Sequence, residues 1–559
     1  MRIIALGLSI CSALAFTSAY AQSTAWQTIV NNGDIMPGTT VPFNSYNQPS
    51  VNAKGLVVLR ARSKGAEGGG GEDTPAAGGD GGGGSGGGQP IHGIYERDMS
   101  KSGNPIVRIF DKTTLVPAPN NTGVTFTEFP SFPRMDIATD MIATRGNSQP
   151  VWEYALPDGT TTKAGTAGIF MDNRRGSFTS MTLLGAVPGF SYYQVPDAPA
   201  AGIKFDVFPG APAATDHYTA FKGNWTDPSG NSQTGVYYRI AGAGSTKRAY
   251  RIADTSALIP GTATPFGSTA PPSAVRDVLV FVGLDNEDKP TFGGIYSAHF
   301  EPNPPLKTLV TIGEAVPGIS GATLNKIGEG VSFDGRYVAF WGAWGTETRN
   351  ITLICPSSGN KALLQYCNTT YPNGFDTTEP VNQGIFVVDT ATKKLSMVAR
   401  TGGLAADNFY NFIYWTFSGK PPGQGGSQEE GSEPPRWRSS AFTALSTANG
   451  SYMVGFKATK NIITQDAPAV QGIYVASRRN PSLASHLSVV NTTTLAEQID
   501  MDANATLLGS TTPLVVSSVG VERDGFRNGH LALAISMTNA DASVSWAGLY
   551  MTDISPKTK

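Results

Sequence analysis

The stretch Gly294-Ile295-Tyr296 is one of seven near-copies of a short pattern, a glycine followed by an aliphatic and an aromatic residue. A β-rich run precedes each copy, such as Tyr337-Val338-Ala339-Phe340, and the copies recur 59 to 90 residues apart. Repeats of this size that hold only strands are typical of β-propellers, because one repeat is too small to bury its own core. We therefore predict an all-β protein, a seven-bladed β-propeller. The other copies are Gly93-Ile94-Tyr95, Gly168-Ile169-Phe170, Gly235-Val236-Tyr237, Gly384-Ile385-Phe386, Gly472-Ile473-Tyr474 and Gly548-Leu549-Tyr550.

Each repeat divides into four expected strands, which we label a to d. In the fifth repeat they are Lys326 to Phe333, Arg336 to Phe340, Gly384 to Val388 and Leu395 to Arg400, and the turn Asp334-Gly335 joins the first two. This layout resembles the blades of the WD40 and TolB-like propellers, in which an Asp-Gly turn likewise joins strands a and b. The Trp-Asp dipeptide and the His signature of WD40 repeats are absent, so the resemblance implies the fold and no function.

The two ends of the chain complement each other. The chain begins with a d-type strand, Trp26 to Val30, and ends with a c-type strand, Gly548 to Asp553. We expect the N-terminal strand to pair with the last blade, so that residues 22–559 form one closed propeller. Such a seam leaves no open sheet edge that would invite aggregation. An open superhelical array or two separate sheets is the alternative.

Residues 1–21 have the features of a secretory signal peptide. Arg2 is followed by an apolar run from Ile3 to Phe16, and Ala19-Tyr20-Ala21 is a small-x-small cleavage site. No later stretch approaches the roughly 20 apolar residues of a spanning helix, so we expect no membrane span. The predicted location is secreted or periplasmic, where the pair Cys355 and Cys367 would form a disulfide.

Charge and metal-ligand patterns exclude some functions. The net charge is −2, only 15% of residues are charged, and there is no basic run, which argues against nucleic acid as partner. No His/Cys cluster with metal spacing occurs, so we predict no metal site and no cofactor. The run Asp285-Asn286-Glu287-Asp288 resembles part of a calcium loop but lacks the glycine and final glutamate of an EF-hand. An acidic turn is the simpler interpretation, and a bound calcium ion is the alternative.

Strand direction alternates within a blade, so the b–c and d–a loops lie on one face of the propeller. Three long insertions fall in these loops. Residues 65–89 are glycine-rich and nearly free of apolar side chains, which predicts a flexible loop. The insertions 341–383 and 402–438 belong to adjacent connections, so we expect them to touch beside the central channel. Function, if it is localised, belongs on this face.

These two insertions carry the candidate ligand-binding residues. Aromatic faces suit sugar rings and arginine forks suit carboxylates, so together they predict an acidic glycan site. The alternative is that the tryptophans pack the insertions onto the blades while the arginines pair with Glu429, Glu430 and Glu433. The candidates are Trp341, Trp344, Arg349, Arg436, Trp437 and Arg438.

A second group follows the b strands. Arg145-Gly146, Lys222-Gly223 and Trp341-Gly342 occupy equivalent positions, and Arg145 and Lys222 are candidates for a shared ligand. For β-elimination of a uronate, an arginine would neutralise the carboxylate and a histidine would act as base, which gives His92, Arg145 and Arg436 as catalytic candidates. Structural roles for these residues remain the alternative.

A hydrolase with paired carboxylates is the other catalytic option. Its candidates near the same face are Asp34, Glu128, Glu314 and Glu329, although turn geometry also explains Asp34 and Glu314. We therefore expect a secreted propeller that recognises, and in the catalytic version cleaves, an acidic extracellular polysaccharide, with lyase favoured over hydrolase activity. The alternative is a non-catalytic propeller that binds an extracellular protein or serves as a cell-surface scaffold, because fold alone does not decide function.

Overall fold

The computed structural model describes residues 25–64, 90–118, 123–155, 161–183, 194–244, 247–357, 360–402, 409–421, 433–448, 450–460, 469–477 and 486–555. The predicted signal peptide (1–21), the glycine-rich loop (65–89) and the pair Glu429 and Glu430 lie outside the described residues. No helix in the described ranges is long and apolar enough to cross a membrane.

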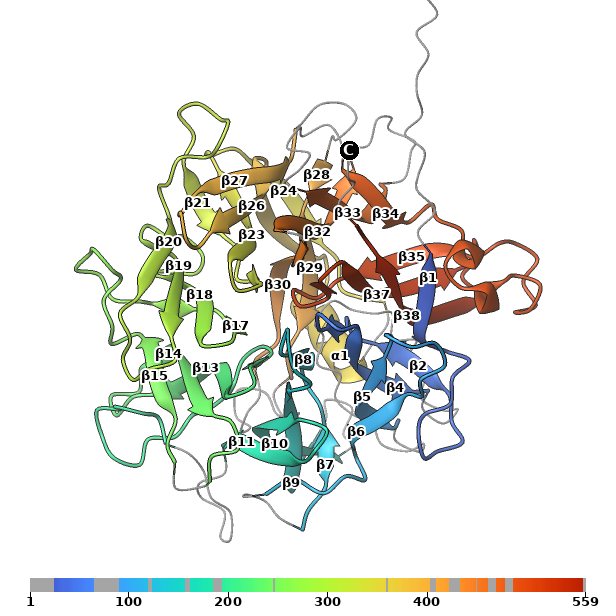
Figure 1. Ribbon diagram of the computed structural model, residues 1–559, viewed down its shortest axis with the longest axis horizontal. Coiled ribbons are helices and arrows are strands. Elements are labelled where there is room, and N and C mark those ends of the chain that lie inside the picture. Colours follow the sequence, from blue (N-terminus) through green and yellow to red (C-terminus); the bar gives the residue numbers. More distant parts are fainter. Residues whose placement is uncertain are drawn as a thin grey trace, which may run out of the picture.

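Seven antiparallel sheets form the blades of a ring (Figure 1), which confirms the predicted seven-bladed propeller. Blade 1 consists of β2 (Phe43–Tyr46), β3 (Ser50–Val51), β4 (Leu56–Ser63), β5 (His92–Asp98) and β6 (Val107–Asp111). Blade 2 consists of β7 (Phe126–Glu128), β8 (Arg134–Met135), β9 (Ile142–Ala155), β10 (Thr161–Asp172) and β11 (Ser177–Thr182). Blade 3 consists of β12 (Ala213–Ala214), β13 (Tyr218–Thr226), β14 (Ser232–Ile240) and β15 (Tyr250–Asp254).

Blades 4 to 7 follow the same order, and blade 7 takes its outer strand from the start of the chain. Blade 4 consists of β16 (Ser268–Thr269), β17 (Ser273–Val275), β18 (Val278–Leu284), β19 (Gly293–His299) and β20 (Lys307–Thr311), and blade 5 of β21 (Leu324–Ile327), β22 (Ser332–Phe333), β23 (Tyr337–Trp344), β26 (Gln383–Asp389) and β27 (Leu395–Arg400). Blade 6 consists of β28 (Phe409–Asn411), β31 (Thr443–Ala448), β32 (Ser451–Lys460), β33 (Gln471–Ser477) and β34 (Leu487–Asn491), and blade 7 of β35 (Val515–Gly520), β36 (Phe526–Arg527), β37 (His530–Thr538), β38 (Ser545–Asp553) and β1 (Trp26–Asn31).

Strand a is divided in most blades, which the sequence did not predict. The segment expected as one strand from Lys326 to Phe333 forms β21 and β22, with a break between them. The inner halves β3, β8, β12, β17, β22, β31 and β36 contact one another in turn, and β36 contacts β3. This unbroken circuit closes the ring and excludes the open array.

The recurring Gly-aliphatic-aromatic triplet has a steric cause. Residues two apart in a strand share a face, and the aromatic ring folds back over the glycine. A Cβ on Gly93 would lie 2.6 Å from the Tyr95 hydroxyl, and one on Gly548 would lie 2.6 Å from the Tyr550 hydroxyl. Glycine is therefore required because the ring occupies the volume of any side chain there.

The N-terminal strand β1 acts as the fourth strand of blade 7. It pairs antiparallel with β38, from Trp26 opposite Thr552 to Asn31 opposite Gly548. Its bulge between Thr28 and Val30 corresponds to the bulge between strands c and d in blades 1 to 6. Closure by the N-terminal strand is thus confirmed.

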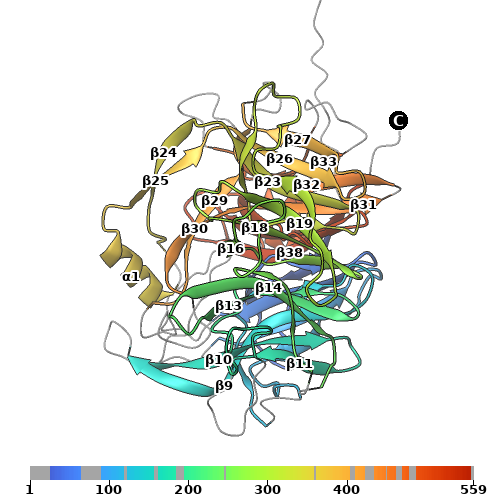
Figure 2. The ribbon, with the colours of Figure 1, turned by 90° about the vertical axis from the view of Figure 1, so that its left-hand side faces the viewer.

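The insertions project from one side of the ring, where Figure 2 shows β24, β25, α1 and β30. The first insertion contains the hairpin β24 (Thr348–Leu353) and β25 (Phe375–Pro380), and helix α1 (Lys361–Thr370), which carries the Cys355–Cys367 disulfide. The second contains the hairpin β29 (Ile413–Ser418) and β30 (Arg436–Ala441). Two 3₁₀ turns, η2 (Ala496–Gln498) and η3 (Met501–Ala503), precede blade 7.

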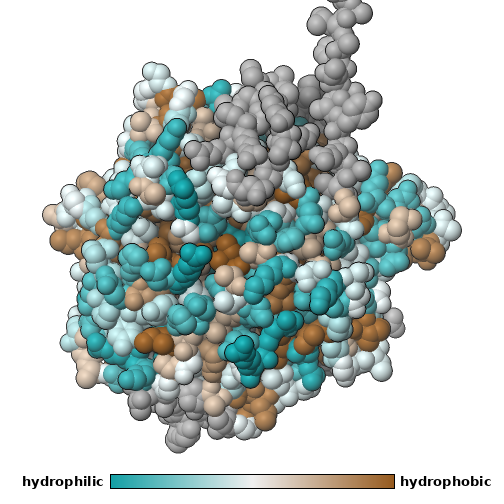
Figure 3. Space-filling view, in the orientation of Figure 1, coloured by the Kyte–Doolittle hydropathy of each residue, from teal (hydrophilic) through white to brown (hydrophobic). Residues whose placement is uncertain are grey.

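The opposite side of the ring carries the short turns. Figure 3 shows this face, with hydrophilic side chains spread over it and hydrophobic ones in separate small groups. Among the residues visible there, the surface offers no broad apolar patch of the kind that marks a protein interface.

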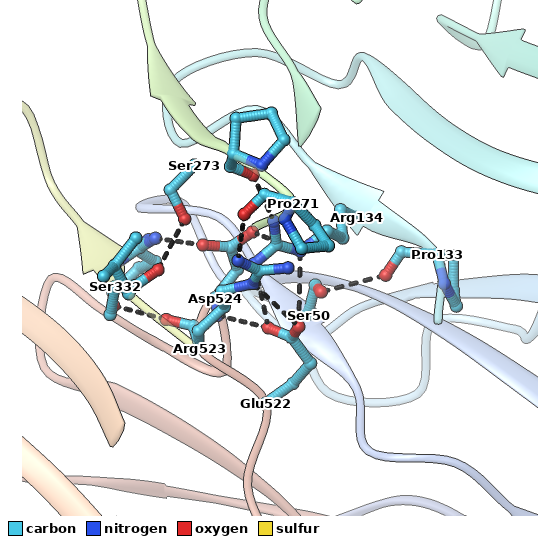
Figure 4. Close-up of polar contacts among 12 residues, drawn as sticks. Ser50, Pro133, Arg134, Pro271, Ser273, Ser332, Glu522, Arg523 and Asp524 are labelled. Carbon is cyan, nitrogen blue, oxygen red and sulfur yellow. Dashed lines mark hydrogen bonds and ion pairs between the residues drawn. The ribbon is translucent and has the colours of Figure 1, made fainter. Parts of the chain in front are cut away.

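A buried ionic cluster fills the channel (Figure 4). The Nε of Arg134, on blade 2, lies 3.3 Å from Glu522 and 3.1 Å from Asp524, both from the segment between β35 and β36. Arg523 donates through Nη1 to the carbonyl of Pro271 on blade 4, at 2.9 Å. We call these residues, Arg134, Glu522, Arg523 and Asp524, the channel plug.

Candidate functional site

A repeated register position puts cations on the loop-bearing side of the first three blades. In each blade the aliphatic residue of the Gly-aliphatic-aromatic triplet pairs with one residue of strand b. On blades 1, 2 and 3 that residue is Arg60, Arg145 and Lys222, all buried. Trp341 and Lys457 occupy the position on blades 5 and 6.

Two of these cations line a cavity of about 110 Å³ above the channel plug. Blades 1 to 3 supply most of the wall, and Ser418, Gly419, Glu433 and Arg438 of the second insertion supply the rest. We call this cavity the basic cup. Its lining from blades 1 to 3 is Asn47, Arg60, Pro130, Ser131, Phe132, Arg145, Gly210 and Ala211.

Arg145 is the central feature of the basic cup. Its side chain is only 4% exposed, its Nε has no hydrogen-bond partner, and its guanidinium forms no ion pair within the described part of the chain. A buried charge costs several kcal/mol unless it is paired. The buried Ser131 hydroxyl beside it also lacks a partner. The cup therefore holds polar groups that a ligand could satisfy.

Glu433 forms the opposite side of the cup. Burial acts to raise the pKa of this carboxyl, but Arg438, Arg145 and Lys222 lower the pKa below its ordinary value. Arg438 pairs directly with Glu433. The carboxylate is thus held ionised at neutral pH.

A second charged cluster adjoins the cup on blades 1 and 2. Glu128 lies 3.3 Å from the Nη2 of Arg62 and 3.9 Å from that of Arg60, and Lys420 of the second insertion reaches it at 3.7 Å. Burial would raise the pKa of Glu128, but these cations and Lys112 lower the pKa instead. Cations outnumber carboxylates across both clusters, so the region is electropositive.

His92 stands at the edge of this cluster, opposite Arg62 in the sheet. Burial, followed by the charges of Arg62, Lys112 and Arg60, lowers the pKa of His92 well below its ordinary value. The imidazole is therefore neutral at pH 7, and its Nδ1 has no hydrogen-bond partner.

The two insertions are predicted to form a ligand-binding wall beside the channel, but in the structure the side chains of this wall, Trp341, Trp344, Arg349, Arg436, Trp437 and Arg438, are largely packed or paired. Trp341 and Trp344 lie within β23, only 8% and 6% exposed, and the Trp341 Nε1 donates to Gln383. Trp437 packs against Phe417 and helix α1. The structure therefore places the three tryptophans in hydrophobic packing and does not bring them together around the cup.

The wall arginines are paired. Arg349 donates to Glu379 from Nη2 at 2.8 Å, Arg436 lies 3.8 Å from Glu287 of blade 4, and Arg438 belongs to the cup. Of the three catalytic candidates, His92 and Arg145 are on neighbouring blades next to Arg60, whereas Arg436 points elsewhere.

The remaining carboxylate candidates have structural partners or lie on the surface. Asp34 and Glu314 accept backbone N–H bonds within their turns, from Asn31 at 2.9 Å and Thr311 at 3.1 Å. Asp285 accepts backbone N–H bonds from its own loop, as an acidic turn does, and no group of three metal-ligating side chains is found in the described ranges.

Two cup residues, Arg60 and Glu433, and Lys420 of the adjoining cluster escaped the sequence reasoning as ligand candidates. Arg60 precedes Ala61 rather than glycine, so the Arg-Gly and Lys-Gly pattern missed it, although its place relative to the Gly93 triplet is the same as that of Arg145. Glu433 and Lys420 reach the site only because the β29–β30 hairpin crosses the channel mouth, which no local pattern signals.

Comparison with known proteins gives only weak similarities. No protein-family model and no curated protein matches the sequence. Among solved structures, a Trypanosoma rangeli sialidase in complex with sialic acid is 10% identical, with a TM-score of 0.33 over 82% of this chain and 59% of that chain. A neuraminidase-like protein from A/bat/Guatemala/164/2009 is 7% identical, with a TM-score of 0.30 over 96% of each chain.

The catalytic domain of a Coprinopsis cinerea GH62 alpha-L-arabinofuranosidase is 10% identical, with a TM-score of 0.22 over 65% of this chain and 94% of that domain. The chain spans about three-fifths of the length of the two sialidase structures. At these identities and TM-scores, the site has to be interpreted from its own residues.

Proposed function

We propose that this protein recognises an acidic polysaccharide on its loop-bearing face, with a uronate carboxylate bound by Arg145 and Arg60 in the basic cup. The observation that carries this proposal is the Arg145 guanidinium, which is buried in the cup wall without an ion pair in the described chain. An anion in the cup would offset the cost of burying that charge, and arginine forks match carboxylates well.

The other lining groups suit a sugar. Asn47, Ser131 and Ser418 offer donors and acceptors for hydroxyl groups, and Glu433 offers a charged acceptor. Phe132 adds an apolar surface for the C–H face of a ring. A simple inorganic anion would use the arginines alone and would not contact the buried Ser131 hydroxyl, which has no hydrogen-bond partner in the described chain.

If the site is catalytic, elimination fits it better than hydrolysis. A glycosidase needs a protonated carboxyl as general acid, and both Glu128 and Glu433 have lowered pKa values that keep them ionised. A lyase needs a neutral base and a cation on the uronate carboxylate. Neutral His92 with Arg60 and Arg145 provides these groups, and a substrate would have to bring its ring proton towards His92.

Binding and depolymerisation of a panel of acidic and neutral polysaccharides test this proposal. We expect the protein to bind uronate-containing polymers and not neutral ones, and Arg145→Met to weaken binding about 10- to 100-fold, as for a lost charged hydrogen bond. Arg175→Met is the matched control, because Arg175 is exposed on blade 2 in the turn between β10 and β11.

Formation of the ultraviolet band of unsaturated uronates would identify a lyase, and its dependence on His92 would be tested with His92→Gln. Equal binding of neutral and acidic polymers, or binding that is unchanged in Arg145→Met, would refute the proposal. No binding and no depolymerisation of any polysaccharide in the panel would favour the non-catalytic scaffold.

A further inference from the structure

We infer that the basic cup takes the end of an acidic glycan, one terminal uronate, and not an internal stretch of the chain. This inference rests on the proposed function and narrows its ligand. Three features support it: a buried ionic cluster next to the cup, a hairpin that lines it and a carboxylate across from the arginines.

The channel plug adjoins the lining of the cup along the chain. The lining residues Pro130 to Phe132 run directly into Pro133 and Arg134, and the Arg134 side chain is fully buried between Glu522 and Asp524 (Figure 4). A ligand in the cup therefore lies next to this buried cluster.

The β29–β30 hairpin bounds the cup from the opposite side. It starts from blade 6, yet Lys420, two residues after β29, lies 3.7 Å from Glu128 on blade 2, and Arg436, the first residue of β30, lies 3.8 Å from Glu287 on blade 4. These contacts place the hairpin across the channel mouth instead of along its edge. Because Ser418, Glu433 and Arg438 of the hairpin line the cup with Arg145, a polymer lying across the face would meet the hairpin there.

The size of the cup agrees with one terminal group. Its volume is about 110 Å³, which is small beside the roughly 300–1,000 Å³ of pockets that enclose most of a drug-sized ligand. This is room for a carboxylate and the adjoining part of a ring, with the rest of the glycan extending towards solvent.

The charges also favour a single acid group. Arg60 and Arg145 line the side formed by blades 1 and 2, whereas the ionised Glu433 lines the insertion side. A terminal uronate can place its carboxylate on the arginines and a hydroxyl on Glu433. An internal segment would bring a second carboxylate towards Glu433, where like charges repel.

Calorimetric titration with oligogalacturonates of two to ten residues tests the inference on the unmodified protein. We expect one protein bound per oligomer at every length, with a Kd per chain that changes less than about threefold. A stoichiometry that rises with length, several proteins on one long chain, would overturn terminal recognition and leave the proposed function standing. No binding by any acidic glycan would refute the proposed function itself.

Oligomers altered at one end identify the end that enters. One set is reduced to the alditol at the reducing end, and the other carries an unsaturated ring at the non-reducing end. We expect one of these two changes to weaken binding by about tenfold or more, and equal binding of both sets would overturn the inference.

Arg145→Met should weaken binding at every length, while Arg175→Met should not. Should Arg145→Met fail to fold, Arg145→Lys keeps the charge without the bidentate fork and is expected to bind all lengths more weakly by a common factor. A loss confined to the long oligomers would contradict entry by the chain end.

Discussion

At the scale of single residues, the blades depend on a glycine whose missing side chain makes room for an aromatic ring. The ring belongs to the residue two positions later, and five of the seven rings are tyrosines that are almost completely buried. Burial raises the pKa of Tyr296 to about 12, so this phenol stays neutral over the whole physiological range. Tyr296 therefore contributes to the packing of its blade and does not act as an acid or base.

Replacing Gly93 by alanine tests this packing. The added Cβ would lie 2.6 Å from the Tyr95 hydroxyl oxygen and 2.8 Å from the Phe110 carbonyl oxygen, so we expect a loss of about 1–3 kcal/mol in unfolding free energy from overpacking. Urea unfolding would measure it. Gly176→Ala, where nothing lies within 4 Å, should change stability little, and equal effects of the two substitutions would contradict the steric explanation.

Lys457 shows what the repeated cationic position costs where no carboxylate of the described residues pairs with the cation. Its ammonium lies 4.1 Å from the centre of the Tyr414 ring, and burial lowers the pKa of Lys457 from 10.5 to about 8. Between pH 8 and 10.5 the unfolded chain binds more protons at this lysine than the folded one. Stability should therefore rise with pH across that window, by at most about 3 kcal/mol from this group.

Lys457→Met should remove this rise and make the protein more stable than the wild type at pH 7. Urea unfolding at pH 7 and pH 10 measures both effects. The variant's own change in unfolding free energy between these pH values gives the contribution of all other titrating groups, which is subtracted from that of the wild type. The same pH dependence in both proteins would show that Lys457 is solvated in the folded state.

Sequence alone identified Arg145 and Lys222 through their place before a glycine, and the structure places both in the electropositive region. Sequence could not tell which tryptophans face solvent. Trp341 occupies the same register position as Arg145, and its burial follows from packing against blade 6, which depends on residues more than 50 positions away.

At the scale of elements, the two insertions form one unit held by a buried carboxylate. Glu379 on β25 accepts hydrogen bonds from Arg349 of β24, from Asn411, and from the Trp415 Nε1 of β29 at 2.6 Å. Helix α1 and its disulfide pack against Phe417 of the same hairpin. The hairpin is thus fixed at its base before it crosses the mouth of the channel.

Glu379→Gln tests this attachment. The substitution leaves Arg349 without its counter-charge and turns an amide N–H₂ towards donors, so we expect a loss of about 3–5 kcal/mol in the stability of the insertion unit. Binding of acidic oligosaccharides should weaken with it, because Glu433 and Arg438 are carried by the hairpin. Glu329→Gln, at an exposed glutamate, is the control, and unaltered ligand binding in Glu379→Gln would show that the hairpin does not depend on this carboxylate.

The number of blades and the order of strands a to d were predictable because glycine, turn and β-rich signals are local, whereas the division of strand a was not. The path of the hairpin was not, since the contacts that direct it, Lys420 with Glu128 and Arg436 with Glu287, join residues from blades 2, 4 and 6. Their pairing depends on how the closed ring brings these blades together. The position of the basic cup was hidden from sequence for the same reason.

At the scale of the whole molecule, the ring is joined at two places that are remote in sequence. The channel plug connects blades 2, 4 and 7 at the centre, through charges that no repeat pattern marks. Burial would raise the pKa of Asp524, but Arg134, Arg527 and Arg523 lower the pKa. Its contribution to stability is present at neutral pH and is lost as pH falls below about 3.9, the usual value for an aspartate.

The second join is the outer seam, where β1 completes blade 7. Val30 is fully buried there opposite Leu549, in the cluster that packs blade 1 against blade 7. Val30→Asp would bury a charge without a partner, so we expect it to cost several kcal/mol and to detach β1. The freed edge of β38 would then expose unpaired backbone groups and promote association.

Size-exclusion chromatography with light scattering, together with thermal unfolding, measures both consequences. Gln27→Asp is the control in the same strand, because Gln27 is exposed and should leave mass and stability unchanged. Oligomers and a lower Tm in Val30→Asp alone would show that the seam protects the last blade. A monomeric Val30→Asp protein of unchanged Tm would mean that the contacts among β3, β36 and the channel plug hold the ring closed without β1.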